Sequence, residues 1–263
     1  MLIAVTRAVS PSFARCELTH LAREPIDVAR ATAQHDAYES LLGALGATVV
    51  RVPAAPESPD AVFVEDTAVV LDEIAVLTRP GAGSRRAEPA AVAAVLAAHR
   101  PVHTMTSPAT LDGGDVLRLG RTLYVGRSSR TNGDGIEQLR EFVEPLGYRV
   151  VPVAFTGCLH LKSAATAVGE GLLLANPAWV SATAFDGCEA VHVDEREPHA
   201  ANALRVAGTV VCSSAYPRTR ERLVERGLRV ETTECDELAK AEGAVTCCSL
   251  IFEGVMPSAT AAP

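Results

Sequence analysis

The chain contains 263 residues, of which 24 are Lys or Arg and 32 are Asp or Glu, giving a formal net charge of −8 at pH 7. With 48% hydrophobic and 21% charged residues, its composition is typical of globular proteins, and its length suffices for one large or two modest domains. The acidic balance argues against a nucleic-acid-binding protein, because affinity for the phosphate backbone requires clustered Lys and Arg, and it suits a cationic ligand better.

Short apolar, β-branched runs alternate with Ala-rich helical stretches along the whole chain, which predicts an α/β architecture. The predicted strands cover residues 1–5, 48–52, 68–70, 74–77, 123–125, 149–153 and 172–174. The predicted helices cover residues 26–45, 87–99, 135–146 and 218–226. Asp27 lies near the positive end of the first helix, and Gly46 follows its last turn, where a left-handed backbone favours glycine.

A weak internal repeat marks the ends of several helices. Three segments, 45–50, 146–151 and 226–230, place a glycine before a strand-like run, and 186–193 is a fourth candidate. A fifth, without the glycine, lies near 99–102, and the spacing of about 40 to 53 residues is near that of ring-forming or solenoid repeats. Glycine after a helix is common in any α/β protein. The sequence therefore leaves open both a repeat architecture and an ordinary α/β fold without repeats.

No linker rich in Pro, Gly or Ser divides the chain, so we expect a single domain over residues 1–254 and a flexible tail over 255–263. Seven cysteines without a C-x-x-C pair predict neither a disulfide framework nor a zinc knuckle and favour a reducing compartment. The apolar start is too short for a signal peptide, and no window offers about 18 uncharged apolar residues. We therefore expect a cytoplasmic protein that does not bind membranes.

Two acidic segments stand in apolar surroundings. Glu65 and Asp66 interrupt an apolar run and require a cationic partner if they are buried, whereas a surface β-turn would leave them solvated. The stretch 111–115 (LDGGD) contains tandem glycines that permit close approach to a ligand, or a simple hairpin turn. No phosphate-binding glycine motif occurs, so the sequence offers no support for a nucleotide site.

Cysteine and histidine supply the candidate nucleophile and base. Cys247 and Cys248 precede a strand-like run, and composition does not distinguish them, although alternation along a strand would put them on opposite faces. His160 stands between two leucines, where a histidine is more often a hydrogen-bonded core residue. A cysteine, a histidine and an orienting carboxylate would together form a nucleophilic triad, but spacing along the chain does not establish that they are adjacent.

Six motifs together resemble the dimethylarginine dimethylaminohydrolases and occur in the order of that family, over residues 8–252. They are 63–66 (FVED), 78–86 (TRPGAGSRR), 111–115 (LDGGD), 129–132 (SRTN), 159–162 (LHLK) and 246–249 (TCCS). The resemblance implies the pentein fold, a five-bladed α/β propeller of ββαβ-type units around a central active-site channel. It also implies that residues 1–254 form one catalytic domain.

The resemblance implies a catalytic set of Cys247 as nucleophile, His160 as general acid and base, and Asp112 as the carboxylate that some relatives replace with Glu. The substrate-binding positions that it implies are Leu18 on a mobile lid, Asp60, Glu65, Asp66, Arg85, Arg130 and the backbone carbonyl of Ala241. In this assignment the three acids face the guanidinium and amino-acid ends, and the two arginines face the α-carboxylate. Residues 13–17 match no motif of the family, so the resemblance does not set the preferred methylation state.

The implied reaction is hydrolysis of Nω-methylated arginine to citrulline and a methylamine through an S-alkylthiouronium, with the bound cation and protonated His160 expected to lower the pKa of the Cys247 thiol. No cofactor is expected, and no zinc-ligand spacing is visible, so any metal would be inhibitory or adventitious. The expected partner is a small cationic substrate, and both a monomer and a homodimer stay open. Alternatives are an arginine deiminase, an amidinotransferase and a non-catalytic binding protein; the first two usually carry insertions for which this chain has no room.

Overall fold

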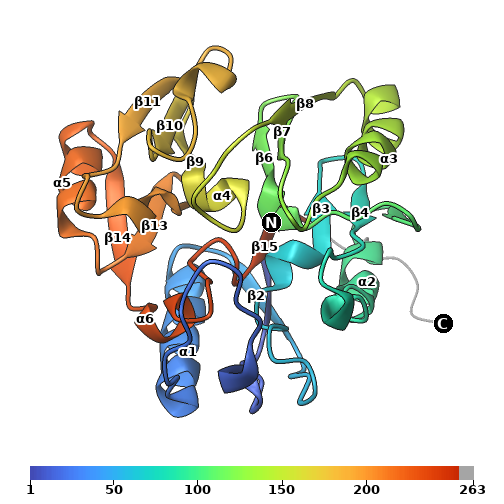
Figure 1. The fold of residues 1–263 in the computed structure, drawn as a ribbon, viewed down its shortest axis with the longest axis horizontal. Coiled ribbons are helices and arrows are strands. Elements are labelled where there is room, and N and C mark those ends of the chain that lie inside the picture. The colour runs from blue at the N-terminus through green and yellow to red at the C-terminus, as the bar shows by residue number, and fades with distance from the viewer. Residues whose placement is uncertain (255–263) are drawn as a thin grey trace.

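The structure, a computed structural model, describes residues 1–254, and within them five three-stranded sheets surround a common centre (Figure 1). In each sheet the first two strands pair antiparallel and the third pairs parallel with the middle strand. A parallel neighbour requires a crossover connection, and in four of the five sheets this connection contains an α-helix, which makes a ββαβ-type unit. The predicted five-bladed pentein propeller is therefore confirmed, whereas the predicted tail, 255–263, lies outside the described residues.

The strands, sheet by sheet, are β15 (Leu250–Glu253), β1 (Leu2–Arg7) and β2 (Thr48–Val52); β3 (Ala68–Val70), β4 (Ala75–Leu77) and β5 (Val102–Thr104); β6 (Val116–Leu119), β7 (Thr122–Gly126) and β8 (Arg149–Val153); β9 (Ala165–Gly169), β10 (Leu172–Ala175) and β11 (Glu189–His192); and β12 (Leu204–Val206), β13 (Thr209–Ser213) and β14 (Arg229–Thr233). The α-helices are α1 (Val28–Ala44), α2 (Ala90–Ala97), α3 (Gly133–Val143), α4 (Leu161–Ala164), α5 (Pro217–Glu225) and α6 (Asp236–Ala239). Two short 3-10 helices, η2 (Val64–Thr67) and η4 (Gly113–Asp115), carry acidic residues of the site.

The two ends of the described chain share one sheet. Strand β15 pairs antiparallel with β1, and their register joins Leu2 to Glu253. The N-terminal ammonium also lies 3.2 Å from the Glu253 carboxylate. Backbone hydrogen bonds between the first and last strands therefore close the ring.

The repeat predicted from the sequence matches the five sheets. Each of the five repeat segments leads into the third strand of one unit, and these strands are β2, β5, β8, β11 and β14. The four expected glycines, Gly46, Gly147, Gly187 and Gly227, all have positive φ, between 72° and 94°. The unit with β10 and β11 has only a 3-10 turn, Ala182–Ala184, where α1, α2, α3 and α5 stand in the others.

Predicted and observed elements differ mainly at short strands. The predicted helix 26–45 begins at Val28, because the Asp27 carboxylate accepts the Arg30 N–H at 3.0 Å and caps the helix there. The sequence did not identify β6, β9, β12 or β13, which contain only three to five residues each. A run this short contains too few positions to display a period.

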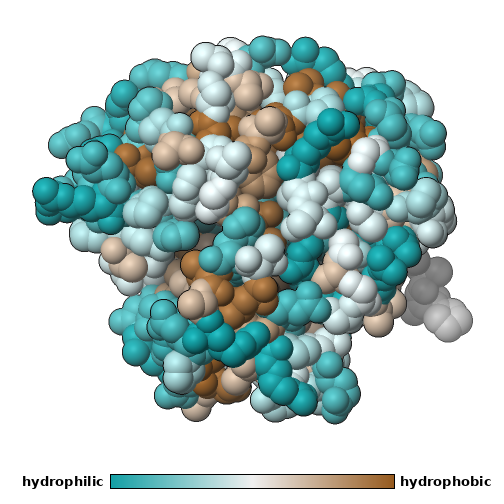
Figure 2. Space-filling view, in the orientation of Figure 1, coloured by the Kyte–Doolittle hydropathy of each residue, from teal (hydrophilic) through white to brown (hydrophobic). Residues whose placement is uncertain are grey.

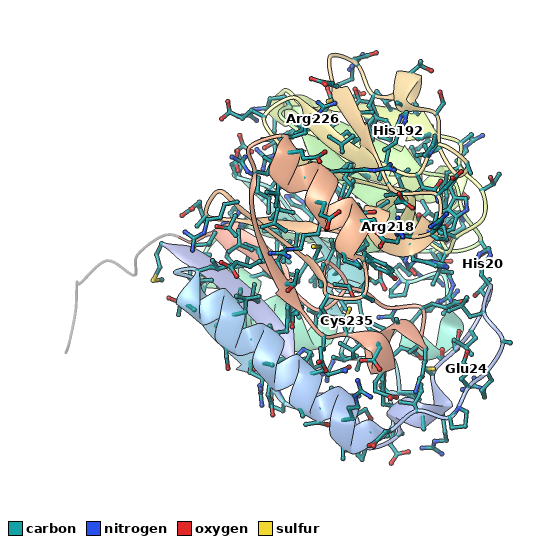
Figure 3. The ribbon with its side chains drawn as sticks, turned by 90° about the vertical axis from the view of Figure 1, so that its left-hand side faces the viewer. His20, Glu24, His192, Arg218, Arg226 and Cys235 are labelled. Carbon is teal, nitrogen blue, oxygen red and sulfur yellow. The ribbon has the colours of Figure 1, made fainter. Side chains whose placement is uncertain are left out.

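The helices cover the outside of the ring. Figure 3 shows α1 and α5 on the outer surface, with Cys235 further inside on the segment after β14. On the face drawn in Figure 2, hydrophilic residues occupy most of the periphery and apolar residues gather near the middle. Among the described residues, no helix combines the length and the apolar character needed to span a bilayer.

Tyr38 of α1 ties the first helix to the turn before β15. Its side chain is 2% exposed, its hydroxyl donates to the Val245 carbonyl at 2.8 Å, and the Ser249 hydroxyl lies 2.7 Å away. Loss of that hydroxyl would leave a buried carbonyl without its donor. The contact therefore fixes the segment that carries Cys247 and Cys248.

We predict that Tyr38→Phe lowers the free energy of unfolding by about 1–3 kcal/mol, measured by urea denaturation. Tyr148→Phe is the matched control, because the Tyr148 hydroxyl donates to Glu73 near the surface, where water can replace it. Equal losses in the two variants would contradict the structural role given to Tyr38.

Candidate active site

A small cavity lies between segments that the different sheets contribute. Its lining residues are Glu17, Asp60, Phe63, Asp66, Arg85, Arg130, Leu159, His160, Ala241, Glu242, Gly243 and Cys247. Its volume of about 20 Å³ is close to that of a single water site. The cavity collects seven of the ten residues expected from the sequence, and an eighth, Asp112, contacts it through His160.

His160 lies between two carboxylates. It directly precedes α4 in an extended conformation, is 5% exposed, and places Nε2 at 3.1 Å from Asp112 Oδ2. Its Nδ1 lies 3.8 Å from Asp66 Oδ1. Burial by itself lowers the pKa of His160, but the Asp66 charge and the hydrogen bond with Asp112 outweigh it and raise that pKa to about 9. The imidazole is therefore protonated at pH 7.

Asp66, on η2, is the acceptor at the centre of this arrangement. Its Oδ2 accepts from Arg85 at 2.6 Å and its Oδ1 accepts the Gly114 N–H at 3.0 Å. Burial opposes ionisation, yet the charges of His160 and Arg85 lower the pKa of Asp66 to about 2. A Cβ on Gly114 would stand 2.7 Å from His160 Nδ1 and 2.8 Å from Asp66 Oδ1, so glycine is required there.

Arg85 is 4% exposed and holds Asp66 in place. Its Nε and Nη2 donate to Glu88 at 3.0 and 2.9 Å, and Nη2 also donates to the Phe63 carbonyl at 2.9 Å. Burial lowers the pKa of Arg85, but Asp66 and Glu88 keep it well above the usual value. Most of the five guanidinium N–H donors are thus engaged inside the protein.

The residues 17–21, which we call the lid, cover the cavity. The Glu17 N–H donates to both Asp60 oxygens, at 3.3 and 3.2 Å. Arg130 Nη2 donates to the Thr19 hydroxyl at 3.3 Å and lies 3.7 Å from the Glu17 carboxylate. The lid therefore engages both Asp60 and Arg130.

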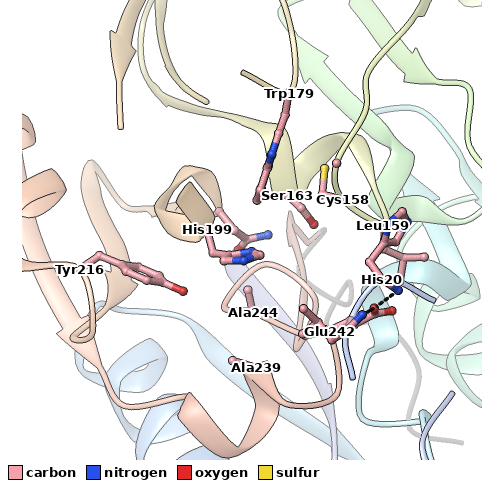
Figure 4. Close-up of a pocket in the computed structure, with 14 residues that line it drawn as sticks. His20, Cys158, Leu159, Ser163, Trp179, His199, Tyr216, Ala239, Glu242 and Ala244 are labelled. Atoms are coloured by element: carbon pink, nitrogen blue, oxygen red, sulfur yellow. Dashed lines mark hydrogen bonds between the residues drawn. The ribbon is translucent and has the colours of Figure 1, made fainter. Parts of the chain in front are cut away.

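Glu242 fastens the other side of the lid. Its carboxylate accepts three successive backbone N–H groups, those of Thr19 (2.9 Å), His20 and Leu21 (2.7 Å), and Figure 4 shows Glu242 beside His20. Its φ of 59° lies in the left-handed region, which is unusual for a non-glycine residue. This backbone conformation aims the carboxylate at the lid, five positions before Cys247.

The two adjacent cysteines differ in their surroundings. Cys247 lines the cavity, whereas Cys248 is 1% exposed and its thiol donates to the Ala244 carbonyl at 3.4 Å. Both lie in a turn before β15, so the turn separates them, not the strand alternation that the sequence suggested. Burial and the nearby charges of Glu65 and Asp66 raise the pKa of the Cys247 thiol, so the thiol is neutral.

Glu65 and Leu18 lie beside the cavity without lining it. The Glu65 carboxylate accepts from Lys162 at 2.6 Å and from the Thr246 hydroxyl at 2.8 Å, and Glu65 lines a separate hollow of about 320 Å³. Burial raises the pKa of Glu65 although Lys162 opposes the shift. The half-buried Leu18 packs on the apolar cluster that contains Ala241 and Cys247.

Several lining residues were not predicted from the sequence. They are Glu17, Phe63, Leu159, Glu242 and Gly243. Leu159 and Phe63 belong to motifs that were recognised for other residues, and Gly243 lies where a Cβ would stand 2.1 Å from the Phe63 ring. Glu17 and Glu242 had no motif of their own. Glu17 is identified by its contacts with Asp60 and Arg130, and Glu242 by its contacts with lid residues more than 220 positions away.

A second hollow of about 300 Å³ adjoins the cavity. It shares Leu159, Glu242 and Gly243 with the cavity, and Trp179 and His199 form part of its wall (Figure 4). Among the described residues, Asp66, Asp112 and His160 could also hold a metal ion, since their ligand atoms lie within 4.8 Å of one another. Protonated His160 and Arg85 already neutralise these carboxylates, so a cation would have to displace a proton.

Known proteins resemble the chain over nearly its whole length. The family model described as "N,N dimethylarginine dimethylhydrolase, eukaryotic" matches residues 18–184. An N(G),N(G)-dimethylarginine dimethylaminohydrolase of Streptomyces coelicolor is 41% identical over 94% of this chain and 95% of its own length. The same-named protein of Pseudomonas aeruginosa is 34% identical over 86% of this chain and 90% of its own.

Solved structures also resemble the chain over nearly its whole length. A cysteine-to-serine variant of the Pseudomonas aeruginosa enzyme in complex with citrulline superposes with a TM-score of 0.91 at 32% identity, covering 95% of this chain and 98% of that one. The N-terminal domain of a cyanobacterial arginine dihydrolase superposes with a TM-score of 0.86 over 96% of this chain and 98% of its own. At 22% identity, the second match supports the fold alone.

The pKa of His160 predicts a pH-dependent stability. The pKa of His160 is about 9 in the folded chain and about 6.5 in the unfolded chain. The stabilisation of the folded state by protonated His160 is therefore complete below pH 6.5 and disappears as the pH rises through 9. We expect the wild type to lose about 3 kcal/mol of unfolding free energy relative to His160→Gln between pH 6 and 10. Urea denaturation of both proteins across this range measures the difference, and parallel pH profiles would contradict the prediction.

Proposed function

The chain belongs to the dimethylarginine dimethylaminohydrolase family, and we propose that it hydrolyses Nω-methylated arginines to citrulline and dimethylamine or methylamine. One observation carries the proposal: a protonated His160, held between Asp66 and Asp112, shares a single cavity with Cys247. A thiol, an acid and paired carboxylates are the groups that displacement at a guanidinium carbon requires.

We propose Cys247 as the nucleophile. Its thiol is neutral before substrate binds, because burial and the nearby carboxylates disfavour the thiolate. A bound guanidinium places a positive charge beside the sulfur and offsets both effects, so the thiol releases its proton to solvent and the thiolate forms only when substrate is present. Attack on the guanidinium carbon then forms the carbon–sulfur bond of the covalent S-alkylthiouronium as the carbon–nitrogen bond to the methylated amine breaks.

His160 serves as acid and then as base in this proposal. Because its pKa is raised to about 9, it holds a proton at neutral pH and donates it to the departing methylated amine. The neutral imidazole then accepts a proton from the hydrolytic water. The resulting hydroxide attacks the thiouronium carbon, the carbon–sulfur bond breaks, and citrulline leaves with the thiolate restored.

The carboxylates fix the planar cation. We propose that Asp66 and Asp112, which already contact the imidazole, also accept N–H bonds from the guanidinium. Glu65 does not bind the guanidinium in this proposal, because its carboxylate faces Lys162 and Thr246. Its backbone N–H donates to the Cys247 carbonyl at 3.1 Å, so Glu65 holds the nucleophile's turn in position.

The amino-acid end of the substrate meets the lid side of the cavity. We propose that Asp60 binds the α-ammonium and Arg130 the α-carboxylate, whereas Arg85 contributes mainly by orienting Asp66. The Ala241 carbonyl and the backbone of Leu18 complete the contacts as the lid closes. The chain needs no cofactor for this reaction.

Two other functions would use the same groups. An arginine deiminase would release ammonia from unmethylated arginine, and a binding protein would release nothing. The names of the relatives at 41% and 34% identity favour the methylated substrate. Since all seven cysteines are free thiols, we also propose that the enzyme works in the cytoplasm or a similarly reducing compartment.

We predict that Cys247→Ser lowers kcat for asymmetric dimethylarginine at least about a thousandfold, because the hydroxyl is a far weaker nucleophile in this site. Cys248→Ala is the matched control and should keep kcat within a few-fold. Citrulline and amine products are measured together for dimethylarginine, monomethylarginine and arginine. Full turnover by Cys247→Ser would exclude this nucleophile, and preferential ammonia release from arginine would identify a deiminase instead.

A further inference from the structure

The lid places one residue across both ends of the amino-acid subsite. The backbone N–H of Glu17 donates to the two Asp60 oxygens at 3.2 and 3.3 Å. The Glu17 carboxylate lies 3.7 Å from Arg130 Nη2, and the Ser84 hydroxyl donates to its other oxygen. One lid residue thus presents an N–H donor to the carboxylate and a carboxylate to the guanidinium.

The same two groups are those that a free amino acid would require. An α-ammonium donates to a carboxylate and an α-carboxylate pairs with a guanidinium, so Glu17 reproduces the hydrogen-bond donor and the anionic acceptor of the substrate's amino-acid end, although its N–H donor is neutral. The space left is about 20 Å³, which is one water molecule and far less than an amino acid occupies. A substrate therefore reaches Arg130 only after the Glu17 carboxylate has left it.

We propose that Glu17 is a built-in competitor that occupies the amino-acid subsite until a substrate displaces it. The inference rests on the proposed function, which assigns Asp60 and Arg130 to the substrate. Every substrate that carries an α-carboxylate must exchange with Glu17, so its apparent affinity is reduced by the fraction of enzyme in which the lid occupies the subsite. Substrates that lack the α-carboxylate do not compete with Glu17 for Arg130, so their apparent affinity is reduced much less.

The geometry of the lid supports exchange without loss of the whole lid. Glu242 holds the N–H groups of Thr19, His20 and Leu21, which lie beyond Glu17 in the chain. The Glu17 side chain is 43% exposed, so it can turn into solvent once its partner is taken. Glu17 therefore leaves Arg130 while the Glu242 contacts keep the segment near the cavity.

The test compares Glu17→Gln with Glu24→Gln, a matched control that removes the same charge from an exposed residue further along the same segment (Figure 3). For asymmetric dimethylarginine we expect KM of Glu17→Gln to fall about two- to five-fold, the range for a partly exposed ion pair, with kcat unchanged. Ser84→Ala should lower KM in the same direction by less, and Glu24→Gln should leave both constants unchanged. With N,N-dimethylagmatine, which lacks the α-carboxylate, KM of Glu17→Gln should match that of the wild type.

The outcomes separate the two proposals. If the wild type turns over dimethylarginine but Glu17→Gln has an unchanged or raised KM, the competitor role is overturned and the hydrolase assignment stands. An equal decrease in KM for both substrates would also overturn it, because general loosening of the lid would then explain the effect. If the wild type releases no amine from any methylated arginine, both proposals fail.

Discussion

The site depends on a buried chain of alternating charges. Asp112, His160, Asp66, Arg85 and Glu88 follow one another at 2.6 to 3.8 Å, and each is at most 5% exposed. None of these charges is tolerable alone in a water-excluded interior, since removing one partner leaves the next uncompensated. The propeller satisfies this constraint because it brings segments of different sheets to one centre and fixes their turns with glycines such as Gly114.

The same chain of charges sets the protonation states that the chemistry needs. It keeps His160 charged and Asp66 ionised, while burial and the carboxylates near Cys247 raise the pKa of that thiol and keep it neutral. In the proposed reaction, a bound guanidinium offsets these effects and makes the sulfur nucleophilic. Glu17 adds a second restraint at the other end of the cavity, where it holds Arg130.

Part of this could be predicted from the sequence. The family resemblance of the motifs implied the five-bladed fold, which the glycine-strand repeat matches. It also implied Cys247, His160, Asp66, Arg85 and Arg130, all of which line one cavity. The direction of Glu65 could not be predicted, because adjacent residues of a 3-10 helix face different sides and only the structure shows Lys162 and Thr246 opposite. The lid contacts were equally hidden, since they join residues 17–21 to Asp60, Arg130 and Glu242 without any local pattern.

The central claim is that His160 is positively charged in the resting enzyme. The most direct measurement is an NMR titration of the histidine side chains, with the His160 signal assigned by its loss in His160→Gln. The account predicts a pKa near 9, well above the ordinary value of 6.5, because Asp66 and Asp112 outweigh the cost of burial. A pKa at or below 6.5 would show that burial dominates, and it would contradict the role of His160 as the acid that protonates the departing amine.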